Sequence, residues 1–132
     1  MNDYEVKIFN RVHSAAAPLC ANNRFVSTII TDPKTAFPAG SLIEISNITA
    51  RKFQSSSPVE NFSIISYQLE VFATTKSECR KVFAAADGAM LAMNFSRVSS
   101  TYMNNASNTK VFRYVARYEA MVDSYGNIYR RG

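Results

Sequence analysis

The sequence predicts a single α+β domain in which two helices cover one face of a mainly antiparallel sheet. Three observations predict this class: a strand-like alternation over residues 62–73, a helical stripe directly after it, and turn residues that separate further short alternating segments. Strands joined by short turns favour antiparallel pairing, and two amphipathic helices need an apolar surface to cover. A chain of 132 residues has the size of one domain, so we expect one two-layer unit over residues 1–132.

The clearest strand lies at the middle of the chain. From Ser63 to Ala73 every second residue after the serine is apolar or aromatic, whereas the other face carries Ser66, Gln68 and Glu70. This period of two predicts a strand with one buried face.

The clearest helix follows that strand. Thr75 and Glu78 have the spacing of a capping box, which predicts where the helix begins. We expect Gly88 to mark a close contact between helix and sheet, because glycine inside a helix otherwise costs up to about 1 kcal/mol relative to alanine. The apolar stripe consists of Cys79, Val82, Phe83, Ala86, Met90 and Met93.

Residues 4–19 predict the first helix, and Pro18 limits how far it continues regularly. Its apolar stripe consists of Ile8, Val12, Ala15 and Leu19, widened by Val6 and Phe9. A turn at 21–23 leads to a short strand over 24–31, and Asp32, Pro33 and Lys34 form the next turn. These features place one helix and one strand before the central strand.

A second strand before the central one covers residues 41–52. It begins after the Phe37-Pro38-Ala39-Gly40 segment, and its isoleucines alternate with Glu44 and Ser46. Residues 53–61, with three consecutive serines and Pro58, predict an exposed, flexible hairpin tip.

The C-terminal part predicts a weaker strand over 94–102, a loop over 103–109 with three asparagines, and a long strand over 112–122. One face of the long strand is apolar or aromatic at every position. The opposite face mixes Arg113, Arg117 and Glu119 with Val111, Val115 and Met121. A turn over 123–127 and a short tail strand over 128–131 complete the chain.

Composition narrows the class of protein. The net charge is +5, from 15 basic and 10 acidic residues, but no run of five like charges indicates a nucleic-acid tail. No apolar run approaches the roughly 20 residues of a membrane span, and we expect no signal peptide and no membrane partner. Cys20 and Cys79 stand far apart, so we expect free, core or half-buried thiols in a reducing cytoplasm.

Residue patterns typical of catalysis are missing from the sequence. His13 is the single histidine, the acidic residues are dispersed, and no serine lies in a nucleophile elbow. With 4 glycines the chain has no phosphate-binding loop. We therefore expect no enzyme activity, no metal and no cofactor.

One segment raises the alternative of nucleic-acid binding. Residues 111–119 interleave arginine with aromatic residues, as sheet-type RNA binders do. A period of two, however, places the rings of Phe112, Tyr114 and Tyr118 on one face and Arg113 and Arg117 on the other. The segment then offers no shared platform for stacking bases, although a nucleic-acid-binding module stays an alternative.

Three ordered stretches resemble a known family. They are Phe37-Pro38 with the Ile-Glu-Ile-Ser-Asn segment at 43–47, the strand-to-helix stretch from Tyr67 through Met90 to the Asn-Phe-Ser-Arg segment at 94–97, and the ending over 113–120 and 126–131. Together they are similar to tail-completion, or tail-terminator, proteins of long-tailed bacteriophages, which are also called head–tail joining proteins. The likeness spans nearly the whole chain.

The resemblance implies an α+β subunit of a hexameric ring in the virion neck, assembled in the host cytoplasm. Such a ring ends the tail tube, joins the tail to the head connector and leaves a channel through which genomic DNA passes without specific recognition. Its partners are further copies of the chain, the tail tube protein and the connector protein. A neck protein on the connector side, acting in head completion, is the alternative.

A ring needs contact residues, and the sequence offers two groups of candidates. For the subunit interface we expect Arg113, Arg117, Glu119, Arg130 and Arg131. For a docking loop that orders on contact with a partner we expect Lys52, Gln54, Ser55, Ser56 and Ser57.

Overall fold

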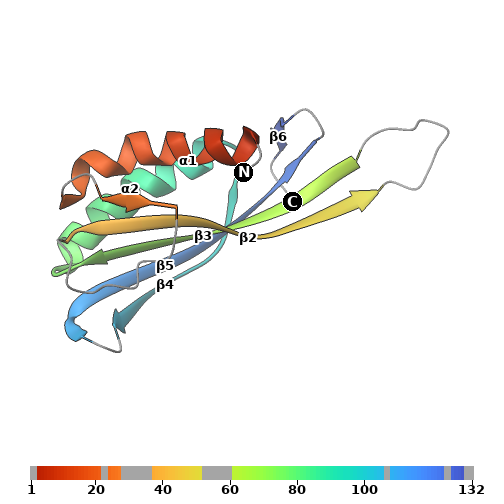
Figure 1. The fold of residues 1–132 in the computed structure, drawn as a ribbon. Helices are drawn as coiled ribbons and strands as arrows, with labels where there is room; N and C mark the ends of the chain where they lie inside the picture. The colour runs from red at the N-terminus through yellow and green to blue at the C-terminus, as the bar shows by residue number, and fades with distance from the viewer. Residues whose placement is uncertain are drawn as a thin grey trace.

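The computed structural model describes residues 3–21, 24–27, 37–51, 61–105, 108–123 and 126–129. Within these residues α1 (Asp3–Ala16) and α2 (Lys76–Ala92) lie side by side on one face of a six-stranded sheet (Figure 1). The predicted α+β class, with two helices on one face, is confirmed. No helix among the described residues is long and apolar enough to cross a membrane.

The sheet has the order β1-β2-β3-β5-β4, and β6 pairs with β5. The strands are β1 (Phe25–Val26), β2 (Ala39–Arg51), β3 (Asn61–Ala73), β4 (Ser96–Asn105), β5 (Asn108–Val122) and β6 (Ile128–Tyr129). All pairs are antiparallel except β1 with β2, which are parallel. Residues 27–38 separate these two strands, a length that permits the crossover that parallel pairing requires.

The core lies between β3, β5 and the two helices. Ile65, Leu69 and Val71 of β3 are fully buried on the face that the helices cover, as the alternation predicted. The predicted stripe of α2 is buried at every position, from Cys79 to Met93. The alternation of β3 and the helical stripe of α2 therefore predicted correctly which face of each element is buried.

Both ends of α2 are fixed by local hydrogen bonds. The Thr75 hydroxyl accepts a hydrogen bond from the Glu78 backbone N–H at 3.2 Å, which confirms the predicted N-cap. At the other end Asn94 has φ 71°, and the N–H of Phe95 donates to the Met90 carbonyl at 3.2 Å. This is a Schellman arrangement, and it turns the chain directly into β4.

The first helix differs from its prediction at both edges of its stripe. Ile8, Val12 and Ala16 are fully buried, whereas Val6 is 43% and Leu19 46% exposed. Val6 is two residues before Ile8, which places it about 200° round the helix. The α-helix ends at Ala16 and the chain tightens into a 3-10 turn over Ala17–Leu19, so Leu19 leaves the stripe.

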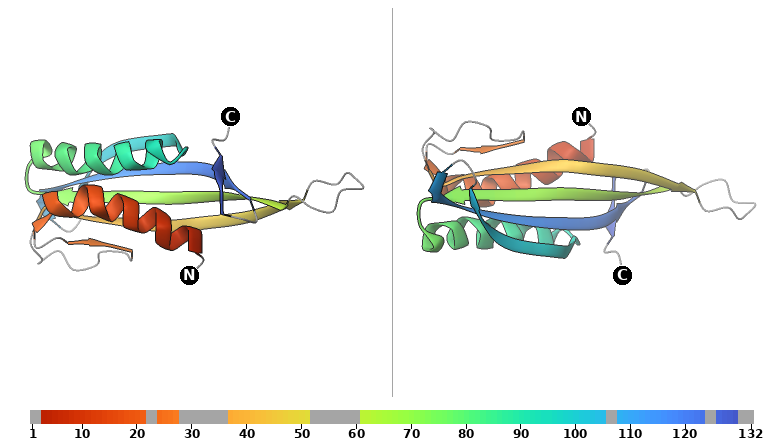
Figure 2. Two further views of the ribbon diagram at one scale, coloured as in Figure 1. Left: turned by 90° about the horizontal axis from the view of Figure 1, so that it is seen from above. Right: turned by 90° about the horizontal axis from the view of Figure 1, so that it is seen from below.

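Other boundaries also shift. The loop predicted over 103–109 was wrong at both ends, because β4 continues to Asn105 and β5 begins at Asn108. The strand predicted over 24–31 is observed only at Phe25–Val26, and 28–31 lie outside the described residues. The predicted hairpin tip over 53–61 also lies outside them except at Asn61, which pairs with Arg51. The strands β2 and β3 extend beyond the helical layer at one end (Figure 2).

Two glycines differ in how closely other parts of the chain approach them. A methyl group at Gly40 of β2 would stand 2.7 Å from Cδ2 of Phe25, which itself is 3% exposed. At Gly88 no heavy atom lies within 4 Å of the corresponding position. The expectation that Gly88 marks a close helix–sheet contact was therefore wrong, and Gly40 is the glycine at a close approach.

We predict that Gly40→Ala lowers the free energy of unfolding by about 1–3 kcal/mol, because the buried Phe25 ring must move. Gly88→Ala is the matched control and raises it by about 0.5–1 kcal/mol, because alanine favours the helix. Urea unfolding followed by circular dichroism measures both. Equal effects of the two substitutions would contradict the close contact between β1 and β2.

Candidate functional site

The predicted interface residues of β5 lie on the sheet face opposite the helices, here called the outer face. Arg113, Arg117 and Glu119 stand next to Phe72, Gln68 and Ser66 of β3 across the antiparallel pair. The outer face is not uniformly solvated. Its buried positions, each at most 6% exposed, are Ala39, Ser41, Glu70, Phe72 and Val111.

An ion pair occupies the buried part of the outer face. Nη2 of Arg113 donates to Oε1 of Glu70 at 2.6 Å, and the Arg113 guanidinium carbon lies 6.0 Å from the centre of the Phe72 ring. The Glu70 side chain is 6% exposed and that of Arg113 32%. A carboxylate this deeply buried requires a cationic partner, so Arg113 serves its own chain first.

Arg117 and Glu119 lie further along β5, in a more open part of the outer face. Nε of Arg117 donates to Oε1 of Gln68 at 3.2 Å, and the Gln68 amide donates to Glu70 at 2.7 Å. The Ser66 hydroxyl donates to Glu119 at 3.4 Å. These contacts align the two side chains on the surface, where Arg117 remains exposed.

The remaining sequence candidates fall into two groups. Arg130 and Arg131, and the loop residues Lys52, Gln54, Ser55, Ser56 and Ser57, lie outside the described residues. His13 is half-buried, with its ring 5.6 Å from that of Phe9 and 6.3 Å from that of Phe25, so it packs as an aromatic residue.

The aromatic residues of β5 face the helices. Tyr118 is fully buried and its hydroxyl donates to Asp87 of α2 at 2.6 Å, while the Tyr114 ring lies 4.1 Å from that of Phe83. Asp87 also pairs with Arg97 of β4 at 3.2 Å. These rings tie the sheet to α2 and cannot stack bases beside Arg113 and Arg117.

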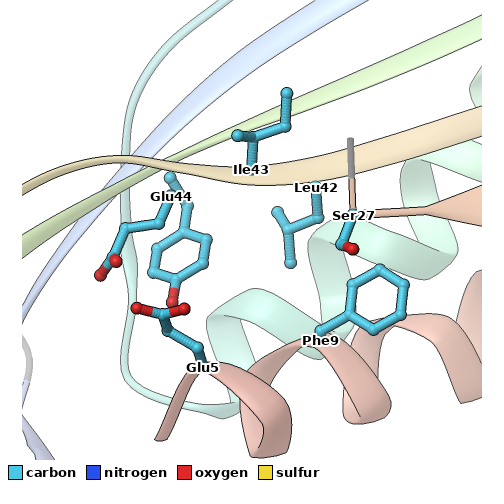
Figure 3. A pocket seen from close by; sticks show the side chains of 7 residues that line it. Glu5, Phe9, Ser27, Leu42, Ile43 and Glu44 are labelled. Atoms are coloured by element: carbon cyan, nitrogen blue, oxygen red, sulfur yellow. The ribbon is translucent and has the colours of Figure 1, made fainter. Parts of the chain in front are cut away.

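Sequence reasoning missed a polar pocket between α1 and β2. The pocket has a volume of about 220 Å³, and Glu5, Phe9, Ser27, Leu42, Ile43, Glu44 and Tyr67 line it. Figure 3 shows the carboxyl groups of Glu5 and Glu44 at one end of this space, with Phe9 and Leu42 at the other. Leu42 and Glu44 lie on the face of β2 that points toward α1. The sequence pattern did not indicate this, because Glu44 alternates there with isoleucines.

The carboxyl group of Glu44 is held in an unusual environment. Burial first, and then the hydrogen bond and the negative charge of Glu5, raise the pKa of Glu44 from an ordinary 4.5 to about 7. The Tyr4 hydroxyl donates to Glu44 at 2.9 Å, which acts in the opposite direction, and Asn47 donates in turn to that hydroxyl.

The Tyr67 hydroxyl completes the polar end of the pocket. Tyr67 is 3% exposed and its hydroxyl has no hydrogen-bond partner among the described residues. Burial first, and then the negative charge of Glu44, raise the pKa of Tyr67, so this hydroxyl keeps its proton. An unpaired buried hydroxyl lowers the stability of the folded state by about 1–3 kcal/mol. A ligand that hydrogen-bonds to this hydroxyl would recover that free energy, so the pocket is a candidate binding site.

Both cysteines are buried inside the fold. Cys20 and Cys79 are both buried and free, as predicted, and burial raises the pKa of each thiol to about 11. Across the described part of the chain, no group of three or more His, Cys, Asp and Glu residues is arranged to hold a metal ion.

Comparison with known proteins supports the fold. Neither a protein-family model nor a curated protein matches the chain. Among solved structures, the chain is similar to one from the "Virion of native gene transfer agent (GTA) particle", with a TM-score of 0.65 and 11% sequence identity. The match covers 89% of this chain and 92% of the other. At this identity the likeness shows a shared α+β fold.

We predict that Arg113→Ala lowers the free energy of unfolding by about 2–3 kcal/mol, because it leaves Glu70 buried without a cation. Arg117→Ala is the matched control and changes it by about 0.5 kcal/mol or less, since Arg117 is exposed. Urea unfolding measures both, and Glu70→Gln in the Arg113→Ala background should recover part of the loss. If Arg113→Ala and Arg117→Ala lowered the free energy of unfolding equally, the result would contradict the buried ion pair of Arg113 with Glu70.

We also predict a change of stability with pH that depends on Glu44. Because its pKa is higher in the folded chain, the folded state holds a proton that the unfolded state releases, and this contribution is lost as pH rises from about 4.5 through about 7. Glu44→Gln removes the titration. Relative to wild type, it should gain about 1 kcal/mol between about pH 5 and about pH 8, after allowance for solvent screening. Thermal melts at both pH values measure this, and an unchanged difference would refute the shifted pKa.

Proposed function

We propose that this chain is a structural subunit of a phage-like virion, and that it forms a hexameric ring at the end of the tail tube nearest the head. The observation that carries the proposal is the similarity in fold to a chain of a gene transfer agent virion, which extends over 89% of this chain. The ordered resemblance of the sequence to tail-terminator proteins supports the same role independently.

The surfaces of the chain suit a ring subunit. A head-to-tail ring joins two different surfaces of each copy, and closure follows from the rotation between neighbours. Figure 2 shows two distinct flanks, one formed by α1, β1 and β2, the other by α2 and β4. Arg117 and Glu119 lie on β5, next to β4, so we propose that they contribute to the second of these surfaces.

The role of the ring follows from the same proposal. Capping stops the addition of tube subunits, and the connector binds the opposite side of the ring. The net charge of +5 is compatible with DNA passing through the centre, but tight phosphate contacts would hinder that passage. We therefore propose that DNA passes without sequence recognition.

We predict that the purified chain, added to polymerising tail tube protein, gives shorter tubes that carry an open ring at one end. Negative-stain imaging measures the tube lengths and the end structures. Gly88→Ala serves as a control variant that adds one methyl group to an exposed position of α2 and changes no charge, and it should cap tubes like the wild type. Arg117→Glu should cap less well, because it reverses a charge on the proposed contact surface.

Two outcomes would count against this role. Tubes of unchanged length with bare ends would contradict tail termination. Rings that bind the isolated connector and ignore tubes would instead favour the head-completion role on the connector side.

A further inference from the structure

The pocket between α1 and β2 gathers hydrogen-bond acceptors without a cation. Its lining residues include two carboxyl groups, those of Glu5 and Glu44, and no basic side chain. Each carboxylate oxygen can accept hydrogen bonds, and the Tyr4 hydroxyl donates its proton to Glu44. The polar end of the pocket therefore has more acceptors than donors.

Tyr67 gives a second, independent reason to expect a ligand. It lines the pocket from β3, is 3% exposed, and its hydroxyl oxygen has no partner among the described residues. Buried hydroxyl groups in folded proteins are nearly always hydrogen-bonded. A donor that enters the pocket would meet this oxygen together with the two carboxyl groups.

We propose that this pocket binds the guanidinium group of an arginine side chain supplied by a neighbouring copy of the chain. A guanidinium carries five N–H donors in one plane and a permanent positive charge, so it can serve both carboxyl groups and the hydroxyl at once. A lysine ammonium is a compact point charge and matches spread acceptors less well.

The other end of the pocket suits the stem of such a side chain. Phe9 and Leu42 form an apolar wall beside the polar end (Figure 3). The methylene groups of arginine commonly lie along apolar surface while the charged head meets polar groups. The division of the pocket into a polar and an apolar end thus matches one amphipathic side chain.

The assignment to a neighbouring copy rests on the ring proposed above. The pocket lies on the α1–β2 flank, and the α2–β4 flank lies on the other side of the molecule (Figure 2). Arg97 of β4 is on that second flank, where its side chain is 40% exposed and forms an ion pair with Asp87 at 3.2 Å. Arg80 precedes Asp87 by two helical turns and shares its side of α2. An acidic pocket and an arginine flank are complementary, as a head-to-tail contact requires.

The first experiment tests the pocket with a defined probe. N-acetyl-arginine methylamide is titrated into the full chain, and NMR signals of the Glu44 carboxyl and the Tyr67 ring are followed; the uncharged isostere N-acetyl-citrulline methylamide is the matched ligand control. We expect both signals to move with the arginine probe, and binding of the citrulline probe to be about tenfold weaker.

The same titration is repeated on three variants. Glu44→Gln should weaken binding of the arginine probe about tenfold and Tyr67→Phe about threefold. Glu78→Gln removes a carboxylate elsewhere and should leave it unchanged.

Equal binding of the two probes, or no response of Glu44 and Tyr67, would overturn the guanidinium site. Thermal melts of each variant confirm that it is folded before it is titrated.

The second experiment tests the source of the arginine through assembly on tail tubes. Glu44→Gln, Arg80→Gln and Arg97→Gln are compared with wild type by ring yield. We expect Glu44→Gln to reduce the ring yield several-fold, and either Arg80→Gln or Arg97→Gln to do the same. Combining Glu44→Gln with that arginine substitution should reduce the yield no more than the stronger of the two single variants. Rings that form equally well with all three variants would overturn the contact with a neighbour while leaving the ring function intact. If wild type itself forms no rings, the ring function fails and the neighbour assignment fails with it, whatever the probe result.

Discussion

The burial of β3 on both of its faces over residues 69–73 is the constraint on which the rest of the structure depends. On one face Ile65, Leu69 and Val71 pack under the two helices and form the core. On the other, Glu70 and Phe72 are also buried, at 5% and 6% exposure. Because a buried carboxylate needs a cation, Glu70 is paired with Arg113, which stands diagonally across from it on β5.

This arrangement determines which surfaces remain for contact with other molecules. Tyr118, hydrogen-bonded to Asp87, and Phe83, packed on Tyr114, hold α2 against β5, so the aromatic side chains of β5 are occupied within the chain. Arg113 is held by Glu70 in the same way. The part of β5 around Arg117, the two flanks and the pocket at Glu44 are left as surfaces through which the proposed ring subunit would contact its neighbours.

Much of the fold could be predicted because local patterns and tertiary packing agree there. The alternation of β3 and the stripe of α2 each have one apolar face, and each is buried as expected. Val6 and Leu19 were misassigned because an apolar residue alone does not reveal where a helix turns or ends. The pocket could not be found from sequence, since Glu5, Glu44 and Tyr67 come from three elements and Glu44 alternates with isoleucine as a solvent-facing residue would.

The central claim is that copies of this chain associate head to tail into a closed ring. Native mass spectrometry over a range of concentrations, with and without tail tube protein, tests it most directly. The account predicts one closed species of fixed stoichiometry, a hexamer, with no ladder of larger assemblies, since a rotation that closes consumes both surfaces of every copy. A symmetric dimer as the largest species, or an unlimited ladder, would contradict it.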